Sequence, residues 1–204
     1  MILSDKGGGE FAQAPAGTHV ARCIKMIDIG TQFGEYQGKP NSARKIVIGF
    51  ELPNELMPDG DYAGKPFIVN KYYTASLSEK ANLRKDLVNW RGREFTPEEL
   101  MGFESKNILG KPCMIQLTPN DKEKVRITGV MALPKGTTVP EQINPSFYFS
   151  LERGEFNHAA FDGLSDYYKE LITKTPEWQS LQSKADPVSK NGGGMDSLDD
   201  DIPF

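Results

Sequence analysis

The chain has 204 residues, 38% of them hydrophobic and 25% charged, which suits one domain of ordinary size plus appendages. No stretch approaches the roughly 18 consecutive apolar residues of a membrane helix, and the first residues lack the basic and apolar regions of a secretory signal. Neither Cys23 nor Cys113 belongs to a CxxC or Cys/His cluster. We therefore expect buried free thiols, no metal or other cofactor, no membrane partner and a cytoplasmic location.

The net charge of −4 is unevenly distributed along the chain. Residues 17–136 contain 18 Lys and Arg against 14 Asp and Glu, whereas residues 186–204 alone carry a charge of −4. The sequence is thus a mildly basic body with an acidic tail. Such an asymmetry indicates an interaction with nucleic acid or with protein rather than a particular fold.

The first half of the body has the composition of three β-strands. Residues 1–16 are expected to form a flexible N-terminal arm. Strands are predicted at 18–30, 43–52 and 66–74, where β-branched, aromatic and other apolar residues are frequent. The glycine-rich residues 30–43 and the Pro-, Gly- and Asp-rich residues 53–66 are predicted to be loops.

The hydrophobic period changes to that of a helix after residue 75. Ser76 and Glu79 match the S-x-x-E pattern of a capping box, and Gly92 lies where the helix would end. Thr96 and Glu99 form a second box around a proline, which predicts a shorter helix.

Further strands are predicted in the second half of the body, followed by helical sequence. Residues 111–118 and 124–133 read as two strands joined by the polar turn PNDKE. A brief strand is predicted in SFYFSL. An amphipathic stretch, LSDYYKELITKTPEWQSL, then predicts a C-terminal helix.

Three strands, a helix and two strands is the element order of an OB-fold, a five-stranded Greek-key barrel with a helix between strands three and four. We therefore predict a mainly β protein with helices and an OB-fold domain over residues 17–151. A C-terminal helical extension is predicted over 152–184, and a disordered linker with an acidic protein-interaction tip over 185–204. Another five-stranded barrel, or an open β-sheet packed on the helix, has the same element count and stays an alternative.

The last ten residues, MDSLDDDIPF, place a run of aspartates before Ile-Pro-Phe, downstream of a glycine run. This segment resembles the C-terminal acidic tip of bacterial single-stranded DNA-binding proteins. The resemblance implies that the tip docks into basic, apolar-floored pockets on replication and repair enzymes, and an aromatic ring beside carboxylates suits such a pocket. The tip residues are Asp199, Asp200, Asp201, Ile202, Pro203 and Phe204.

The body does not resemble the bacterial proteins. It is similar instead to a phage-encoded replication protein family, whose members share EKANLRKDL followed by Trp-Arg-Gly, and NILGKPC followed by GVMALPKG. Together the two resemblances imply a phage-encoded single-stranded DNA-binding protein, with residues 17–151 as its OB-fold DNA-binding domain. Its expected role is non-catalytic, in DNA replication, recombination and repair in the host cytoplasm.

Single-stranded DNA is usually held by a basic groove and by aromatic faces on which bases stack. The candidates for this role are Phe33, Tyr36, Lys39, Arg44, Lys45, Lys71, Tyr72, Tyr73, Lys124 and Arg126. A core position is favoured for Phe50 and Phe67, and packing of the helix on the sheet is favoured for Trp90. A solvated helix face is expected for the basic residues Lys80, Arg84, Lys85, Arg91 and Arg93.

Two other functions stay open. An adaptor would use the tip to capture host enzymes without binding DNA. A metal-dependent nuclease would use Asp59 and Glu104, because PD and ESK formally match a PD…ExK pattern. Such chemistry, however, requires the two acids on adjacent strands. The sequence does not distinguish a preference for single strands from one for duplexes. It also leaves open whether copies associate, through strand edges or through residues 164–182.

Overall fold

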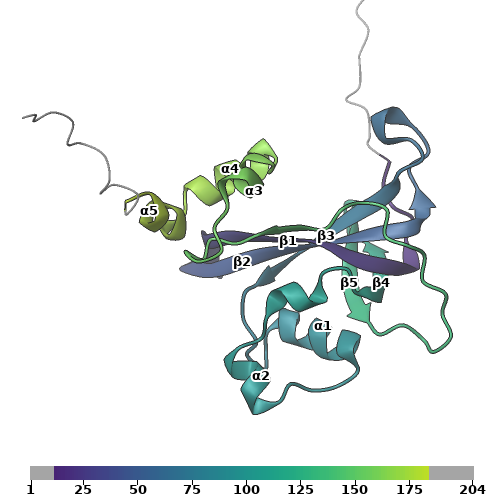
Figure 1. The fold of residues 1–204 in the computed structure, drawn as a ribbon, viewed down its shortest axis with the longest axis horizontal. Helices are drawn as coiled ribbons and strands as arrows, with labels where there is room; N and C mark the ends of the chain where they lie inside the picture. Colours follow the sequence, from purple (N-terminus) through teal and green to yellow (C-terminus); the bar gives the residue numbers. More distant parts are fainter. Residues whose placement is uncertain (1–11, 184–204) are drawn as a thin grey trace, which may run out of the picture.

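The computed structural model describes residues 12–183, in which a six-stranded sheet is the central element (Figure 1). Its strands are β1 (Gly17–Tyr36), β2 (Lys39–Leu56), β3 (Pro66–Thr74), β4 (Pro112–Pro119), β5 (Val125–Met131) and β6 (Phe147–Phe149). The helices are α1 (Asn82–Arg91), α2 (Pro97–Met101), α3 (His158–Asp162), α4 (Asp166–Thr173) and α5 (Pro176–Gln182), with 3₁₀ turns η1 (Gly60–Tyr62) and η2 (Ser105–Ile108). The predicted mainly β architecture with helices is confirmed.

Five strands are hydrogen-bonded in the order β3–β2–β1–β4–β5, and all four pairings are antiparallel. The short β6 pairs with β1 in parallel. β3 and β5 are the first and last strands of this order. They contact each other but no hydrogen-bonded ladder joins them, so the sheet is open. Figure 1 shows α1 and α2 on one side of the sheet and α3, α4 and α5 on the other. None of the described helices is long and apolar enough to span a membrane.

The connection between β1 and β2 is a tight hairpin, so the prediction of a long loop over residues 30–43 is wrong. Gln37 and Gly38 form the turn with φ of 53° and 75°, the left-handed values that a two-residue type I′ turn requires. Strand pairing continues from Thr31↔Arg44 to Tyr36↔Lys39. The glycines and polar residues of this segment therefore form an extended two-stranded ribbon.

Helix α1 begins five residues later than the capping-box pattern indicated, because its N-cap is residue 81 instead of Ser76. Its N-cap is Ala81, which offers no side-chain cap, and Ser76 Oγ instead accepts a hydrogen bond from Ser78 N at 3.2 Å. The Ala81 N–H bonds to the Ser78 carbonyl, so the segment before the helix is a turn. The predicted end is confirmed, because Gly92 adopts φ of 68° just after Arg91.

The other helix signals agree with the structure. In α2, the Thr96 hydroxyl accepts from Glu99 N and the Glu99 carboxylate accepts from Thr96 N, which is the predicted capping box. The amphipathic stretch 164–181 forms two short helices, α4 and α5, rather than one. Thr175 lies between them and caps α5, since its hydroxyl accepts from Trp178 N.

The sheet is buried on both faces. The inner face, towards α1, packs Ile48, Phe50, Tyr73, Leu87 and Ile115 into one cluster. The outer face, towards α4, packs Ile27, Val47, Phe149, Tyr168 and Ile172 into another. This explains why β2 reads as a nearly continuous apolar run: its alternate residues enter different clusters.

The positions expected in the core are confirmed. Phe50 and Phe67 are buried, and Trp90 lies against Phe50 with its indole N–H donating to the Pro112 carbonyl at 2.7 Å. Cys23 and Cys113 are buried free thiols, and burial raises the pKa of Cys23 to about 12.

The C-terminal helices are fastened to the β1–β2 hairpin by two contacts. Glu177 accepts hydrogen bonds from Thr31 N at 3.0 Å and Thr31 Oγ1 at 2.6 Å. At Gly30, where φ is 68°, a Cβ would lie 2.8 Å from Thr175 Cγ2 and Oγ1. The absence of a side chain at Gly30 therefore lets the start of α5 approach β1 closely.

Replacing Gly30 by alanine should lower the free energy of unfolding by about 1–3 kcal/mol, because it adds backbone strain and a clash with the buried Thr175. Chemical denaturation of the full chain measures this. Gly34→Ala is the matched control, since Gly34 lies in the same hairpin and a Cβ there meets nothing within 4 Å. Equal stability of the two variants would show that the contact does not hold the helices.

Candidate nucleic-acid interface

The outer face of β2 and β3 carries an aromatic and a basic residue side by side. The ladder pairs Val47 with Tyr72 and Lys45 with Thr74, and strand alternation directs Lys45 and Tyr72 to this same face. Tyr72 is 50% exposed although it lies in the middle of a strand pair. We call Lys45, Tyr72 and Thr74, together with the residues added below, the outer patch.

Helix α4 brings a second exposed tyrosine to the outer patch. Tyr168 is buried in the outer cluster, whereas Tyr167 is 58% exposed, and their rings meet edge to face at 5.4 Å. Both phenols interact with Tyr72. Burial and the hydrogen bond with Tyr168 raise the pKa of Tyr72 to about 12. Two neutral, partly exposed rings are thus available for stacking.

A polar hollow of about 360 Å³ adjoins Tyr72. Lys45 and Lys80 line it together with hydroxyl-bearing Thr74, Ser76 and Ser78. Lys45 Nζ donates to Thr74 Oγ1 at 2.8 Å, and within residues 12–183 neither lysine has a carboxylate partner. Their charges are therefore available to an anion such as a phosphate.

Lys25 adds a cation on β1 that has no carboxylate partner within residues 12–183. It pairs across the ladder with Gly49, whose other neighbour is Asn70 of β3. A Cβ on Gly49 would lie 2.9 Å from Lys25 Cβ and 2.8 Å from Asn70 Oδ1, so both side chains cross directly over the glycine. Burial lowers the pKa of Lys25, and no described carboxylate offsets that cost. A bound phosphate would supply the missing negative charge.

Two of the predicted DNA-contacting residues face the interior instead. Tyr73 is only 4% exposed, and its hydroxyl donates to Asp86 Oδ2 at 2.6 Å. Lys71 Nζ also reaches Asp86 Oδ2 at 2.6 Å. The assignment of Tyr73 and Lys71 to the DNA surface was wrong, because their shared strand parity points to α1. Together with Asp86 they fasten that helix to the sheet.

Arg44 is also engaged within the protein. It forms an ion pair with Asp28, whose carboxylate additionally accepts from Gly30 N at 3.0 Å and Leu151 N at 3.2 Å. This arrangement joins β1, β2 and the segment after β6. Arg44 is therefore better explained as a bridge between these segments than as a phosphate ligand.

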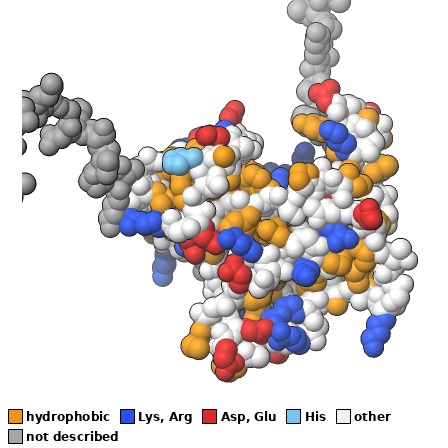
Figure 2. Space-filling view, viewed as in Figure 1, with side chains coloured by type: hydrophobic (Ala, Val, Ile, Leu, Met, Phe, Trp, Pro, Cys, Tyr) orange, Lys and Arg blue, Asp and Glu red, His pale blue; other side chains and the backbone are white. Residues whose placement is uncertain are grey.

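Phe33, Lys39, Lys124 and Arg126 are exposed but lie apart from the outer patch. Phe33 is 71% exposed and Lys39 is exposed, both near the end of the β1–β2 hairpin with Tyr36. Lys124 and Arg126 are exposed at the start of β5, at the other edge of the open sheet. Figure 2 shows Lys and Arg side chains interspersed with apolar ones over one face of the molecule rather than in a single basic block.

The basic run on and around α1 is largely neutralised, and the expectation of a fully solvated helix face is wrong, because Arg84 and Arg91 are half-buried. Arg84 pairs with Glu94 at 3.6 Å, and Arg91 and Arg93 both pair with Glu99. Lys80, which precedes the helix, is the member of the run that joins the outer patch.

Sequence reasoning missed Lys25 and Tyr167. Lys25 follows a bulge in β1, and a bulge breaks the alternation of side chains along a strand. The face of the sheet on which Lys25 lies could therefore not be predicted from its position in the strand. The helical period of DYYKELIT indicates that Tyr168 is buried and that Tyr167 is exposed. The sequence does not show that this helix lies beside β3. The predicted tip, Asp199 to Phe204, lies outside the described residues.

A scan against protein-family models and a search of curated protein sequences found no match to this chain. Residues 12–183 contain no group of three or more His, Cys, Asp and Glu that could hold a metal ion. Asp59 precedes η1 and Glu104 precedes η2, and the Glu104 carboxylate accepts from Lys106 N.

Proposed function

We propose that this protein binds single-stranded DNA without catalysis and without base-specific readout, through the outer patch. The observation that carries the proposal is the pair of exposed rings, Tyr72 and Tyr167, beside lysines that no described carboxylate neutralises. Stacking on every base's flat face and contact with phosphates give affinity without sequence preference. Single strands suit this surface better than duplexes, because their bases are free to stack.

The strand order supports the finer assignment of an OB-fold. The order β3–β2–β1–β4–β5, with contact between β3 and β5, would become a barrel if those two strands closed. Helices α1 and α2 occupy the predicted place between β3 and β4. OB-folds hold nucleic acid on the face of strands two and three, which here carries Lys45 and Tyr72.

For the acidic tail we propose recruitment of replication, repair and recombination enzymes, on the strength of its sequence alone. Its charge of −4 would compete with DNA for the lysines of the outer patch. A chain of residues 1–185 should therefore bind DNA as tightly as the full chain or more tightly, while losing its partner enzymes. A loss of DNA affinity on truncation would contradict this division of roles.

A fluorescence-anisotropy titration tests DNA binding. The probe is a labelled thymidine oligonucleotide of about 16 nucleotides, the upper end of the site size of one OB-fold. Between about 50 mM and about 200 mM salt the affinity should fall, with a log–log slope near −2 if three lysines contact phosphates. No binding at low salt would favour an adaptor that acts through the tail alone. Shortened oligonucleotide after incubation with Mg²⁺ would indicate a nuclease.

A further inference from the structure

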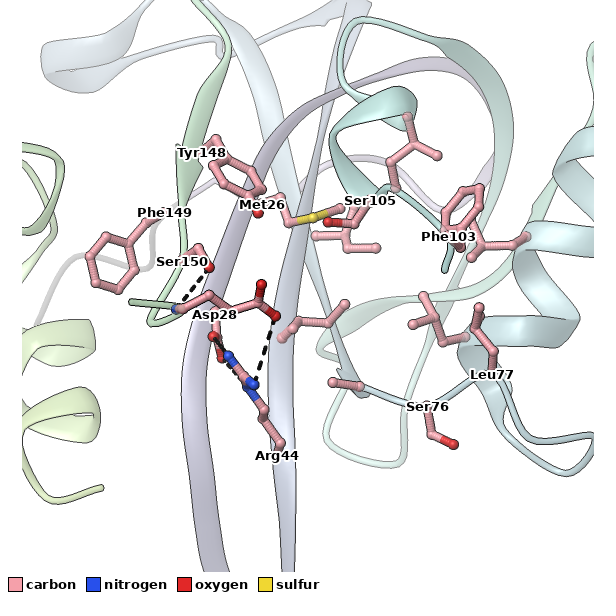
Figure 3. Close-up of a pocket in the computed structure, with 17 residues that line it drawn as sticks. Met26, Asp28, Arg44, Ser76, Leu77, Phe103, Ser105, Tyr148, Phe149 and Ser150 are labelled. Atoms are coloured by element: carbon pink, nitrogen blue, oxygen red, sulfur yellow. Dashed lines mark hydrogen bonds and ion pairs between the residues drawn. The ribbon is translucent and has the colours of Figure 1, made fainter. Parts of the chain in front are cut away.

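A second hollow lies beside the outer patch, on the inner face of the sheet. It encloses about 260 Å³ between β1, β2, β6 and the segments that flank α1 (Figure 3). Its wall is mostly apolar and includes the aromatic rings of Phe103, Tyr148 and Phe149. In Figure 3 Arg44 and Ser76 lie at one end of the hollow, and Phe103, Ser105 and Tyr148 line the opposite side. Residues of the inner cluster border this space, but their side chains do not fill it.

The charged groups in this wall are already paired. Asp28 accepts from Arg44 and from two backbone N–H groups, so this carboxylate has little capacity for a charged ligand. The neutral polar groups along the wall are the hydroxyls of Ser76, Ser105, Tyr148 and Ser150. Tyr148 donates its hydroxyl to Glu155, and Ser150 Oγ accepts from Glu152 N. An apolar, aromatic space with a few hydroxyls suits a neutral planar group. Its volume is below the roughly 300–1,000 Å³ of sites for drug-sized ligands, so the group must be small.

The apolar hollow and the polar hollow of the outer patch meet at one residue. Ser76 lines both, and the segment Ala75 to Ser78 forms part of each wall. On one side of Ser76 lies the aromatic space. On the other side lie Lys45 and Lys80, which have no carboxylate partner among the described residues. An apolar space for a ring next to a cationic space for a phosphate has the chemical layout of a nucleotide site.

We infer that the inner hollow takes one unstacked nucleobase of the bound strand, while Lys45 and Lys80 hold the adjacent phosphate. This inference rests on the proposed function and adds to it a specific subsite. A base in a single strand has no pairing partner to give up, so its transfer from water into an aromatic pocket is less costly than from a duplex. The strand would thus be held by stacking outside, on Tyr72 and Tyr167, and by one base inserted inside.

Filling the hollow tests the subsite. Ser105→Phe places a ring in the space, and Ser105→Ala is the matched control that removes the same hydroxyl without filling it. The labelled thymidine oligonucleotide should bind Ser105→Phe roughly 10-fold more weakly, the loss expected for one base contact, and Ser105→Ala nearly as well as the unmodified chain. Equal affinity of all three folded proteins would overturn the inference. Thermal unfolding checks that both variants fold.

Photo-crosslinking of the unmodified chain gives an answer even if Ser105→Phe does not fold. The probe is the same oligonucleotide with 5-iododeoxyuridine in place of thymidine, and the crosslinked residues are located by mass spectrometry. We expect crosslinks to Phe103 or Tyr148 in addition to those on the outer patch. Crosslinks to Tyr72 or Tyr167 alone would overturn the inner subsite and leave the proposed function intact. Absence of any crosslink and of any binding would count against both.

A crosslinking experiment with a mononucleotide tests whether the hollow binds a base of a DNA strand or a free nucleotide. If 5-iododeoxyuridine monophosphate crosslinks to Phe103 or Tyr148 while the oligonucleotide does not, the hollow is a free-nucleotide site and the inference is wrong. Crosslinking of the oligonucleotide at these residues supports it.

Discussion

The double variant Lys45→Glu, Tyr72→Ala is expected to bind a thymidine oligonucleotide roughly 100-fold more weakly than the unmodified chain. Removing one stacking ring costs about 1–3 kcal/mol, and reversing an unpaired charge beside phosphates adds to this. Each 1.4 kcal/mol corresponds to a factor of ten in the dissociation constant. Both side chains lie on the outer face and belong to neither cluster of the core, so the fold should survive the loss of the hydrogen bond between Tyr72 and Tyr168. Anisotropy titrations at one fixed salt concentration measure the change.

The chain contains a matched control for this variant. Lys65 lies over the ring of Tyr62 at 5.2 Å, and Tyr62 is exposed on η1, away from the outer patch. Lys65→Glu, Tyr62→Ala therefore makes the same changes of charge and ring at another exposed site. Comparable losses in the two variants would mean that any lysine–tyrosine pair on this surface contributes equally, and the outer patch would lose its special role.

The second large effect is expected on stability, from Glu51. This carboxylate is 0% exposed and accepts from Ile143 N at 2.9 Å, Asn144 N at 2.7 Å and Asn144 Nδ2 at 2.6 Å. It holds the segment before β6 against β2. Glu51→Ala leaves these donors without their acceptor, so the free energy of unfolding should fall by about 2–4 kcal/mol. Chemical denaturation monitored by circular dichroism measures the loss.

Glu55→Ala is the control for Glu51→Ala, since it removes the same side chain four residues along the same strand. Glu55 is partly exposed, and its partner is His19 at 3.1 Å. A single partly buried hydrogen bond of this kind contributes about 0.5–1.5 kcal/mol. If Glu55→Ala destabilised the protein as much as Glu51→Ala, the role assigned to the buried hydrogen bonds would be wrong.

Much of the fold could be predicted from local sequence signals. The apolar runs located every strand, and the box formed by Thr96 and Glu99 located α2, because these features depend on neighbouring residues alone. The β1–β2 hairpin was missed because a glycine-rich, polar segment has the composition of a loop. The start of α1 was predicted too early for a related reason. The Ser76 hydroxyl matches the pattern of a helix cap, but it stabilises a turn before the helix instead.

The site could be predicted only in part, because it depends on contacts between distant segments. Tyr72 and Lys45 were identified from strand composition and lie together as the ladder requires. The same composition also predicts Tyr73 as a DNA contact. Its hydroxyl instead donates to Asp86, thirteen residues along the chain, and this contact is not visible in the strand sequence. Tyr167 was missed because the docking of α4 beside β3 is a tertiary contact that no local pattern reveals.

The most direct test of DNA binding through the outer patch is an NMR titration of the ¹⁵N-labelled full chain with the thymidine oligonucleotide. We predict the largest shifts of backbone amide signals at Lys45, Asn70, Tyr72, Thr74 and Tyr167. Largest shifts at the hairpin residues Phe33 and Lys39, or at Lys124 and Arg126 on β5, or no shifts at all, would contradict this account.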